Sequence, residues 1–164
     1  MCEHDPFNEP ETAHARAREL MKEEFFWDCV DEWAPFGSDE GNDAYHEWRS
    51  WRSENPAANL LDCLDWILVG RSNEYDERLL DEATIQRDAA NPDSTFLAEH
   101  YDVFTLDTTV IATALGQLMD EGRIDHEAKP YVKTAIARQS RPEFGGNGER
   151  LEYLTAIARV IDEA

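Results

Sequence analysis

Apolar residues recur at helical spacing along most of this chain, and this period restricts the fold more than any other feature of the sequence. The clearest case spans residues 107–121, where one face collects Val110, Ile111, Ala114, Leu115, Leu118 and Met119. Gly122 follows where a left-handed residue often ends a helix, and Ile124 can make the hydrophobic contact that accompanies such an end. The pattern predicts a mainly α fold, a compact bundle of about six helices.

The same period, in weaker form, predicts the other helices. They are expected over residues 12–22, 42–53, 56–69, 74–90, 126–139 and 151–161. Asn55 and Pro56 have the residue types of a helix start, and Gly70 has that of a helix end. Asp125 is expected to cap the helix that follows it.

Strand signals are scarce. Residues 101–106 are the best candidate for a strand, and residues 23–36, rich in aromatics, suit a helical turn or a short strand equally. At most one short strand pair is therefore expected. A length of 164 residues suits one domain. We predict that it covers residues 1–164, with residues 1–10 frayed and a loop at residues 142–148.

Acidic residues outnumber basic ones by 36 to 15, which gives a net charge of −21 spread over both halves of the chain. Such a field repels nucleic acid and anionic membrane surfaces, so we expect direct binding to neither. A partner, if there is one, is expected to be a protein with a basic surface, or a cation. Adaptation to a salt-rich host would explain the same charge, and the sequence does not indicate an oligomeric state.

The chain carries no signal for export or for a membrane span. No apolar run approaches the roughly 18 residues that a membrane span needs, and the N-terminus lacks the parts of a signal peptide. We therefore expect a cytoplasmic protein. Three cysteines without a C-x-x-C pair argue against a disulfide framework. Cys29 and Cys63 lie among apolar neighbours and are expected to be buried, and Cys2 is expected on a frayed end.

Signatures of catalysis are absent from the sequence. Metalloprotease, phosphate-binding-loop, dinucleotide-binding and nucleophile-elbow patterns do not occur. The histidines are too far apart to make a metal-ligand pair one helical turn apart: His4, His14, His46, His100 and His126. No catalytic residue and no cofactor are therefore expected, apart from a divalent cation if the acidic segment 39–46 binds one.

That acidic segment follows Pro35-Phe36-Gly37 and allows two interpretations. In the structural one, those three residues form a turn, Ser38, Asp39 or Asn42 caps the next helix, and Gly41 takes a positive φ. In the functional one, Asp39, Asp43 and His46 hold a divalent cation, helped by nearby oxygens such as those of Asp28 or Asp31. The segment is no EF-hand, because Ser50 stands where such a loop needs its glutamate.

All five tryptophans lie within residues 27–66. They can form a local core, or some can line a groove beside the acidic segment that suits a cationic partner. The residues that such a partner surface would use are Trp27, Asp28, Asp31, Trp33, Phe36, Glu40, Trp48 and Trp51.

Two segments, residues 23–44 and 104–125, resemble the YfeS-like family of bacterial proteins, and the likeness extends from residue 20 to about 140. A pattern F-W-D followed by P-F-G-x-D-x-G-x-D carries it, through Trp27, Asp28, Pro35, Phe36, Gly37, Asp39, Gly41 and Asp43. The family is sometimes associated with WGR-domain and molybdate-regulator-like proteins. This chain shows no WGR domain, so the resemblance implies no nucleic-acid role. It implies a bacterial cytoplasmic protein and no activity or catalytic residue.

Three functional hypotheses follow. The leading one is a non-enzymatic protein-interaction or regulatory module that meets a basic partner through the aromatic and acidic face of residues 27–51. The second is a metal-binding protein or small metal-dependent hydrolase that uses the acidic segment 39–46. The third is an inhibitor or immunity-type protein whose carboxylates imitate the phosphates of a nucleic acid.

Overall fold

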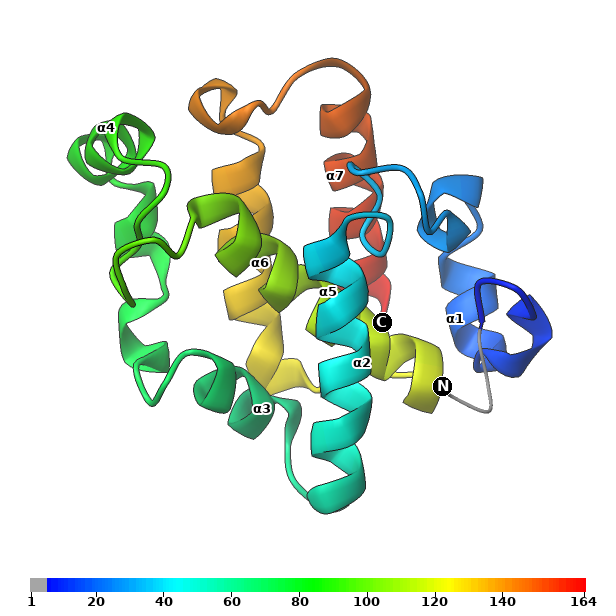
Figure 1. The fold of residues 1–164 in the computed structure, drawn as a ribbon. Coiled ribbons are helices and arrows are strands. Elements are labelled where there is room, and N and C mark those ends of the chain that lie inside the picture. The colour runs from blue at the N-terminus through cyan, green and yellow to red at the C-terminus, as the bar shows by residue number, and fades with distance from the viewer. Residues whose placement is uncertain (1–5) are drawn as a thin grey trace.

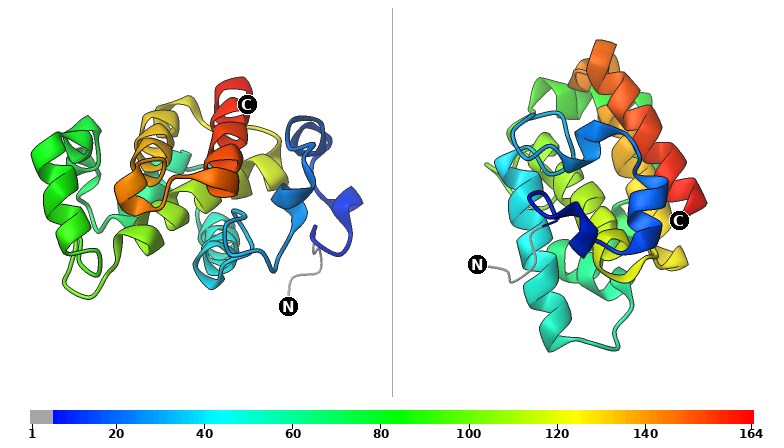
Figure 2. Two further views of the ribbon diagram at one scale, coloured as in Figure 1. Left: turned by 90° about the horizontal axis from the view of Figure 1, so that it is seen from above. Right: turned by 90° about the vertical axis from the view of Figure 1, so that its right-hand side faces the viewer.

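The fold is organised around α5 (Val103–Glu121), a helix that is buried on nearly all sides. The computed structural model describes residues 6–164, which form helices joined by loops, without strands in that range. Fifteen of the nineteen residues of α5 are buried, because its sequence is apolar or small around most of its circumference. α5 packs against α1, α2, α3 and α6, and α7 packs on α6. Figure 1 shows α1 and α4 at opposite edges of this arrangement, and Figure 2 shows the same from two further sides.

The α-helices of the described residues, besides α5, are α1 (Ala15–Leu20), α2 (Asp39–Glu54), α3 (Leu60–Ile67), α4 (Glu82–Ala90), α6 (Lys129–Gln139) and α7 (Gly148–Glu163). Short 3-10 helices join them: η1 (Pro10–Thr12), η2 (Glu24–Trp27), η3 (Ser72–Glu74), η4 (Glu77–Leu80), η5 (His126–Ala128) and η6 (Pro142–Phe144). The mainly helical prediction is confirmed. The strand predicted at residues 101–106 is wrong, because Asp102 accepts a hydrogen bond from the Thr105 amide at 2.5 Å and starts α5 there.

Local capping chemistry explains the other differences from the predicted boundaries. α3 starts at Leu60 and not at Pro56, because Asn59 and Asp62 form a reciprocal capping box. The helix predicted at residues 74–90 is divided into η3, η4 and α4, with extended backbone at Asp76 and Asp81. Asp125 does not cap the helix that follows it, although the sequence predicts that it does. Its carboxylate instead accepts the Leu60 amide at 2.9 Å and thereby stabilises the start of α3.

Other sequence predictions have mixed outcomes. Gly122 ends α5 with φ 74°, as predicted. Cys63 is buried, and burial raises the pKa of its thiol to about 12. Cys29 is exposed, so its predicted burial is wrong. Cys2 and His4 lie outside the described residues. No helix within residues 6–164 combines the length and the apolar character that crossing a bilayer requires.

An ion pair lies at the centre of the core. Arg138 of α6 donates to both carboxylate oxygens of Asp107 on α5, at 2.8 and 2.9 Å, and both side chains are at most 1% exposed. Tyr75 donates to Asp107 at 2.5 Å and Gln139 at 2.6 Å, so the carboxylate is fully satisfied. Burial by itself would lower the pKa of Arg138, but the charge and hydrogen bonds of Asp107, together with nearby Tyr75 and Asp88, outweigh burial and raise that pKa.

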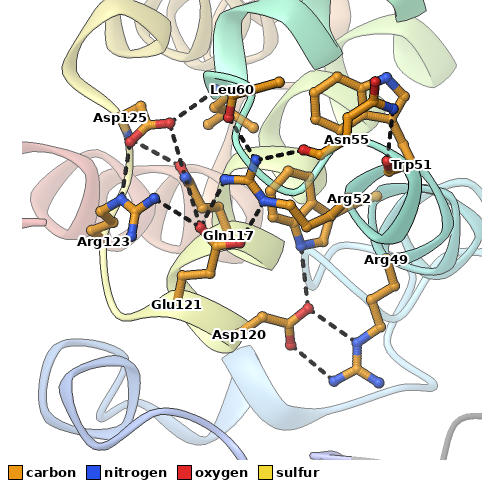
Figure 3. A network of polar contacts seen from close by, with 12 residues as sticks. Arg49, Trp51, Arg52, Asn55, Leu60, Gln117, Asp120, Glu121, Arg123 and Asp125 are labelled. Carbon is orange, nitrogen blue, oxygen red and sulfur yellow. Dashed lines mark hydrogen bonds and ion pairs between the residues drawn. The ribbon is translucent and has the colours of Figure 1, made fainter.

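A second polar network ties the end of α5 to α2 and α3 (Figure 3). Arg49 binds Asp120 through two nitrogens, at 2.9 and 3.1 Å. Arg52 binds Glu121 through two nitrogens, at 2.6 and 2.9 Å, and also donates to the Ala58 carbonyl. Both arginines of α2 therefore point toward α5, where their charges are neutralised by Asp120 and Glu121.

The central ion pair yields a stability prediction. Asp107→Ala should destabilise the fold by about 3–5 kcal/mol, because it leaves the buried Arg138 guanidinium without its counter-charge. The double variant Asp107→Leu/Arg138→Met should lose less unfolding free energy than the sum of the losses of Asp107→Leu and Arg138→Met, since each single variant leaves a buried charge unpaired and the double variant does not. Urea unfolding measures both, and additive losses would contradict the interpretation.

Candidate functional site

The loop of residues 28–38 is held in shape by its own aspartates. Asp28 accepts the backbone amides of Val30 and Asp31, at 2.7 and 3.0 Å, and these bonds lower the pKa of its carboxyl. Asp31 accepts the Trp33 amide at 3.0 Å and the Tyr153 hydroxyl at 2.8 Å. The loop is thereby stabilised by its own hydrogen bonds and fixed to α7 through Tyr153.

Two glycines let this loop pack tightly on the start of α2. A Cβ at Gly37 would lie 1.8 Å from the Asp31 carbonyl oxygen, and a Cβ at Gly41 would lie 1.9 Å from the Pro35 oxygen. The predicted positive φ of Gly41 is wrong, because this residue is helical and its hydrogen side chain serves close approach instead. The predicted turn at residues 35–37 is confirmed, and Ser38 is the N-cap, since its hydroxyl accepts the Gly41 amide at 3.1 Å.

Between this loop and its neighbours lies a depression of about 650 Å³, here called the Trp33 groove. Its walls come from the loop, the start of α2, α5, η6 and α7, and its lining residues are Cys29, Val30, Glu32, Trp33, Gly37, Ser38, Asp39, Glu40, Phe104, Phe144 and Arg150. Val30 is 80% exposed and Trp33 is 46% exposed. The Trp33 ring meets Phe104 edge to face, at 6.1 Å between centroids. The groove thus offers apolar and aromatic surface to solvent.

Arg150 forms the floor of the groove. It is 7% exposed, and its guanidinium lies 4.6 Å from the Trp33 ring centroid and 5.5 Å from that of Phe104. It donates to two uncharged oxygens, the Gln139 amide oxygen and the Phe144 carbonyl. Burial lowers the pKa of Arg150. Because Gln139 also binds Asp107, the groove floor is connected to the central ion pair.

The rim of the groove is acidic. Glu32, Asp39 and Glu40 line it, and among the described residues none of their carboxylates takes part in a salt bridge or a side-chain hydrogen bond. Together with Arg150 these groups give the groove a negative excess. Asp39 and Glu40 also occupy the first turn of α2, where the helix dipole favours acids.

The structure brings only part of the predicted partner surface together. Trp33 and Glu40 line the groove, and Asp28 and Asp31 shape its loop. Trp27 lies apart from the groove lining, where its indole donates to the Met21 carbonyl at 2.8 Å.

The other predicted partner residues have roles elsewhere. Phe36 and Trp48 are at most 1% exposed and lie in the core, so the structure offers no surface of theirs to a partner. Trp51 stacks on Trp48 farther along α2.

Sequence reasoning missed Phe104 and Arg150, since only the fold brings α5 and α7 to the loop. It also missed Trp66, which is 54% exposed. The exposure of Trp66 could have been predicted from helical spacing, because this residue lies off the apolar face that Leu60, Leu64 and Leu68 define.

The three predicted metal ligands line separate depressions. Asp39 faces the Trp33 groove, whereas Asp43 and His46 line two others farther along α2. Across residues 6–164, no group of three or more His, Cys, Asp and Glu side chains is arranged to hold a metal ion. The metal site at Asp39, Asp43 and His46 therefore stays a prediction for experiment.

Comparison with known proteins supports the resemblance to the YfeS-like family. The chain is 26% identical over 127 residues to the protein named "Uncharacterized protein YfeS" of Escherichia coli (strain K12). The alignment covers 77% of this chain and 50% of that protein, so the chain spans about half the length of the curated relative it matches. No protein-family model and no solved structure matches the chain.

The Ser38 cap yields a second stability prediction. Ser38→Ala should lower the free energy of unfolding by about 1 kcal/mol, because the Gly41 amide loses its acceptor. Ser53→Ala is the matched control at the other end of α2, and it should change that free energy by less than about 0.5 kcal/mol. Urea unfolding compares the two, and equal effects would contradict the cap.

The predicted cation site is tested by melting temperature with EDTA, and then with calcium, magnesium, manganese or zinc. If Asp39, Asp43 and His46 hold a cation, that cation at about 100 times its Kd adds roughly 2.7 kcal/mol and raises the melting temperature by several degrees. The variant Asp39→Ala/Asp43→Ala should lose that rise. Unchanged melting temperatures with all four cations would contradict the site.

Proposed function

We propose that this chain is a protein-interaction module that binds a basic segment of a partner protein in the Trp33 groove. The observation that carries the proposal is the combination of exposed Val30 and Trp33 with three carboxylates, of Glu32, Asp39 and Glu40, that form no ion pair with any of residues 6–164. Exposed aromatic surface beside unpaired acids suits an arginine or lysine side chain, whose stem is apolar and whose head is cationic.

The distribution of basic residues supports this partner. Most arginines form ion pairs within the fold, for example Arg49 with Asp120, Arg52 with Glu121 and Arg159 with Glu23. The acids on the groove rim are left without such a cation among the described residues. A basic partner would supply the missing charges, and the net charge of −21 would speed its approach.

The rigidity of the loop also supports binding. Residues 28–38 are held by hydrogen bonds of Asp28 and Asp31, and Trp33 contacts both Phe104 and Arg150. A surface that is already ordered loses little conformational entropy when a partner binds. The buried Arg150 places one positive charge at the floor of the groove, so a partner's cations would bind at the acidic rim.

A peptide titration tests the proposal. A four-residue peptide of alternating arginine and leucine should bind, and the same peptide with glutamate for arginine should not. Trp33→Ala and Asp39→Asn/Glu40→Gln should each weaken binding by roughly tenfold or more. NMR signals of the tryptophan indoles follow the titration and detect weak binding.

The matched control is Glu11→Gln/Glu19→Gln, which changes the net charge equally at exposed acids outside the groove. It should leave the affinity within about twofold, because long-range attraction is screened at physiological salt. Equal loss in the control and in Asp39→Asn/Glu40→Gln would mean that only the overall charge matters, and would overturn the proposal.

A further inference from the structure

The Trp33 groove continues along α2 through two further depressions. The next one, of about 500 Å³, has Glu40, Asp43, Glu47 and Trp66 in its walls. The one after it, of about 600 Å³, has Glu47, Trp51, Glu54 and Trp66. Glu40 belongs to both the first and the second depression, and Glu47 and Trp66 belong to both the second and the third. The three are therefore neighbours on one surface.

The periodicity of α2 explains this surface. Gly41, Ala44, Tyr45 and Trp48 are buried, and α2 packs on α5. The acids that line the depressions recur at helical spacing on another face: Glu40, Asp43, Glu47 and Glu54. No hydrogen bond or ion pair to the described residues engages their carboxylates. Both arginines of α2 turn toward α5, as Figure 3 shows, and leave this acidic face uncompensated.

Apolar surface accompanies the acids here as it does in the groove. Trp66 is 54% exposed and stands between the second and third depressions, with Val69, 75% exposed, shortly after it in the chain. The two ends of the surface thus repeat one composition, an exposed tryptophan beside unpaired carboxylates. Such a repeat suits two anchor side chains on one partner segment.

We infer that the partner segment is extended and basic, and that it runs along α2 from the Trp33 groove to a second anchoring site at Trp66 and Glu47. The inference rests on the proposed function of the groove. From Glu40 to Glu54 the helix rises by about 21 Å, at roughly 1.5 Å per residue. An extended segment covers that length with six or seven residues, at about 3.3 Å per residue. Side chains on one side of it recur every 7 Å or so, which lies within the range of axial rises between successive α2 acids, from about 4.5 Å (Glu40 to Asp43) to about 10.5 Å (Glu47 to Glu54).

Charge complementarity selects this occupant over the alternatives. A second copy of the chain would bring another net charge of −21 to an acidic face, and an anionic ligand would meet the same repulsion. A basic extended segment brings both missing partners, cations for the carboxylates and apolar stems for Trp33 and Trp66.

Two peptides test the inference: the four-residue peptide described above, and an eight-residue peptide that continues the alternation of arginine and leucine. The longer one should bind wild type roughly tenfold or more tightly, because it adds the second anchor. The variant Trp66→Ala/Glu47→Gln should lose that gain and leave the affinity of the short peptide unchanged. Both substituted residues are exposed, and circular dichroism checks that the variant keeps its fold.

The outcomes separate the inference from the proposal on which it rests. If the short peptide binds through Trp33 but the long peptide gains nothing, or keeps its gain in Trp66→Ala/Glu47→Gln, the inference is wrong and the proposed function stands. If neither peptide depends on Trp33, the proposed function fails and the inference fails with it. The control Glu11→Gln/Glu19→Gln should preserve the gain, and a loss of the gain there would also overturn the inference.

Discussion

The structure depends on a charge pair enclosed in an apolar core. Asp107 and Arg138 join α5 to α6, and Tyr75 and Gln139 complete the hydrogen bonding of the carboxylate from two further positions. A buried pair of this kind adds little stability over an apolar pair of equal size, but it strongly penalises any arrangement that separates its members. It therefore fixes how α6, and the segment that carries Tyr75, lie against α5.

Nearer the surface, other arginines also form ion pairs that hold separate segments together. The acids that these arginines bind are neutralised, and the remaining acids keep an unpaired charge. Asp120 and Glu121 hold Arg49 and Arg52, and Glu23 holds Arg159, so these cations join segments that are distant in sequence. With 36 acids and 15 bases, the chain cannot pair every carboxylate. The unpaired ones on α2 gather beside exposed tryptophans, and this coincidence of charge and apolar surface, not the acidity alone, distinguishes the proposed docking face from ordinary solvated surface.

Much of the fold could be predicted from sequence, because periodicity reports burial. The apolar residues of α5 and its end at Gly122 show this most clearly. Predictions of caps, helix starts and burial failed where a side chain binds backbone that is distant in sequence, or where a helix cap overrides a weak strand pattern. Asp125 stabilises the start of α3, Asp102 converts a strand-like segment into a helix start, and Cys29 belongs to a loop that turns outward. Trp33 and Glu40 belong to the predicted aromatic and acidic face and line the groove, whereas Arg150 reaches it from α7 by tertiary packing, which local spacing does not encode.

The arginine bridges give the molecule an asymmetric response to pH. Burial by itself would raise the pKa of Glu23 and Glu121, but the hydrogen bonds and charges of Arg159 and Arg52, together with other neighbouring groups, outweigh burial, and the pKa of both carboxyls lies below the ordinary value of 4.5. Such groups add stability above the pKa of the unfolded chain and lose it as pH falls through the folded value. Guanidinium groups keep their charge far into the alkaline range. Acid therefore weakens these ion pairs while alkali leaves them intact, so the contacts that hold distant segments of the chain together fail on the acid side first.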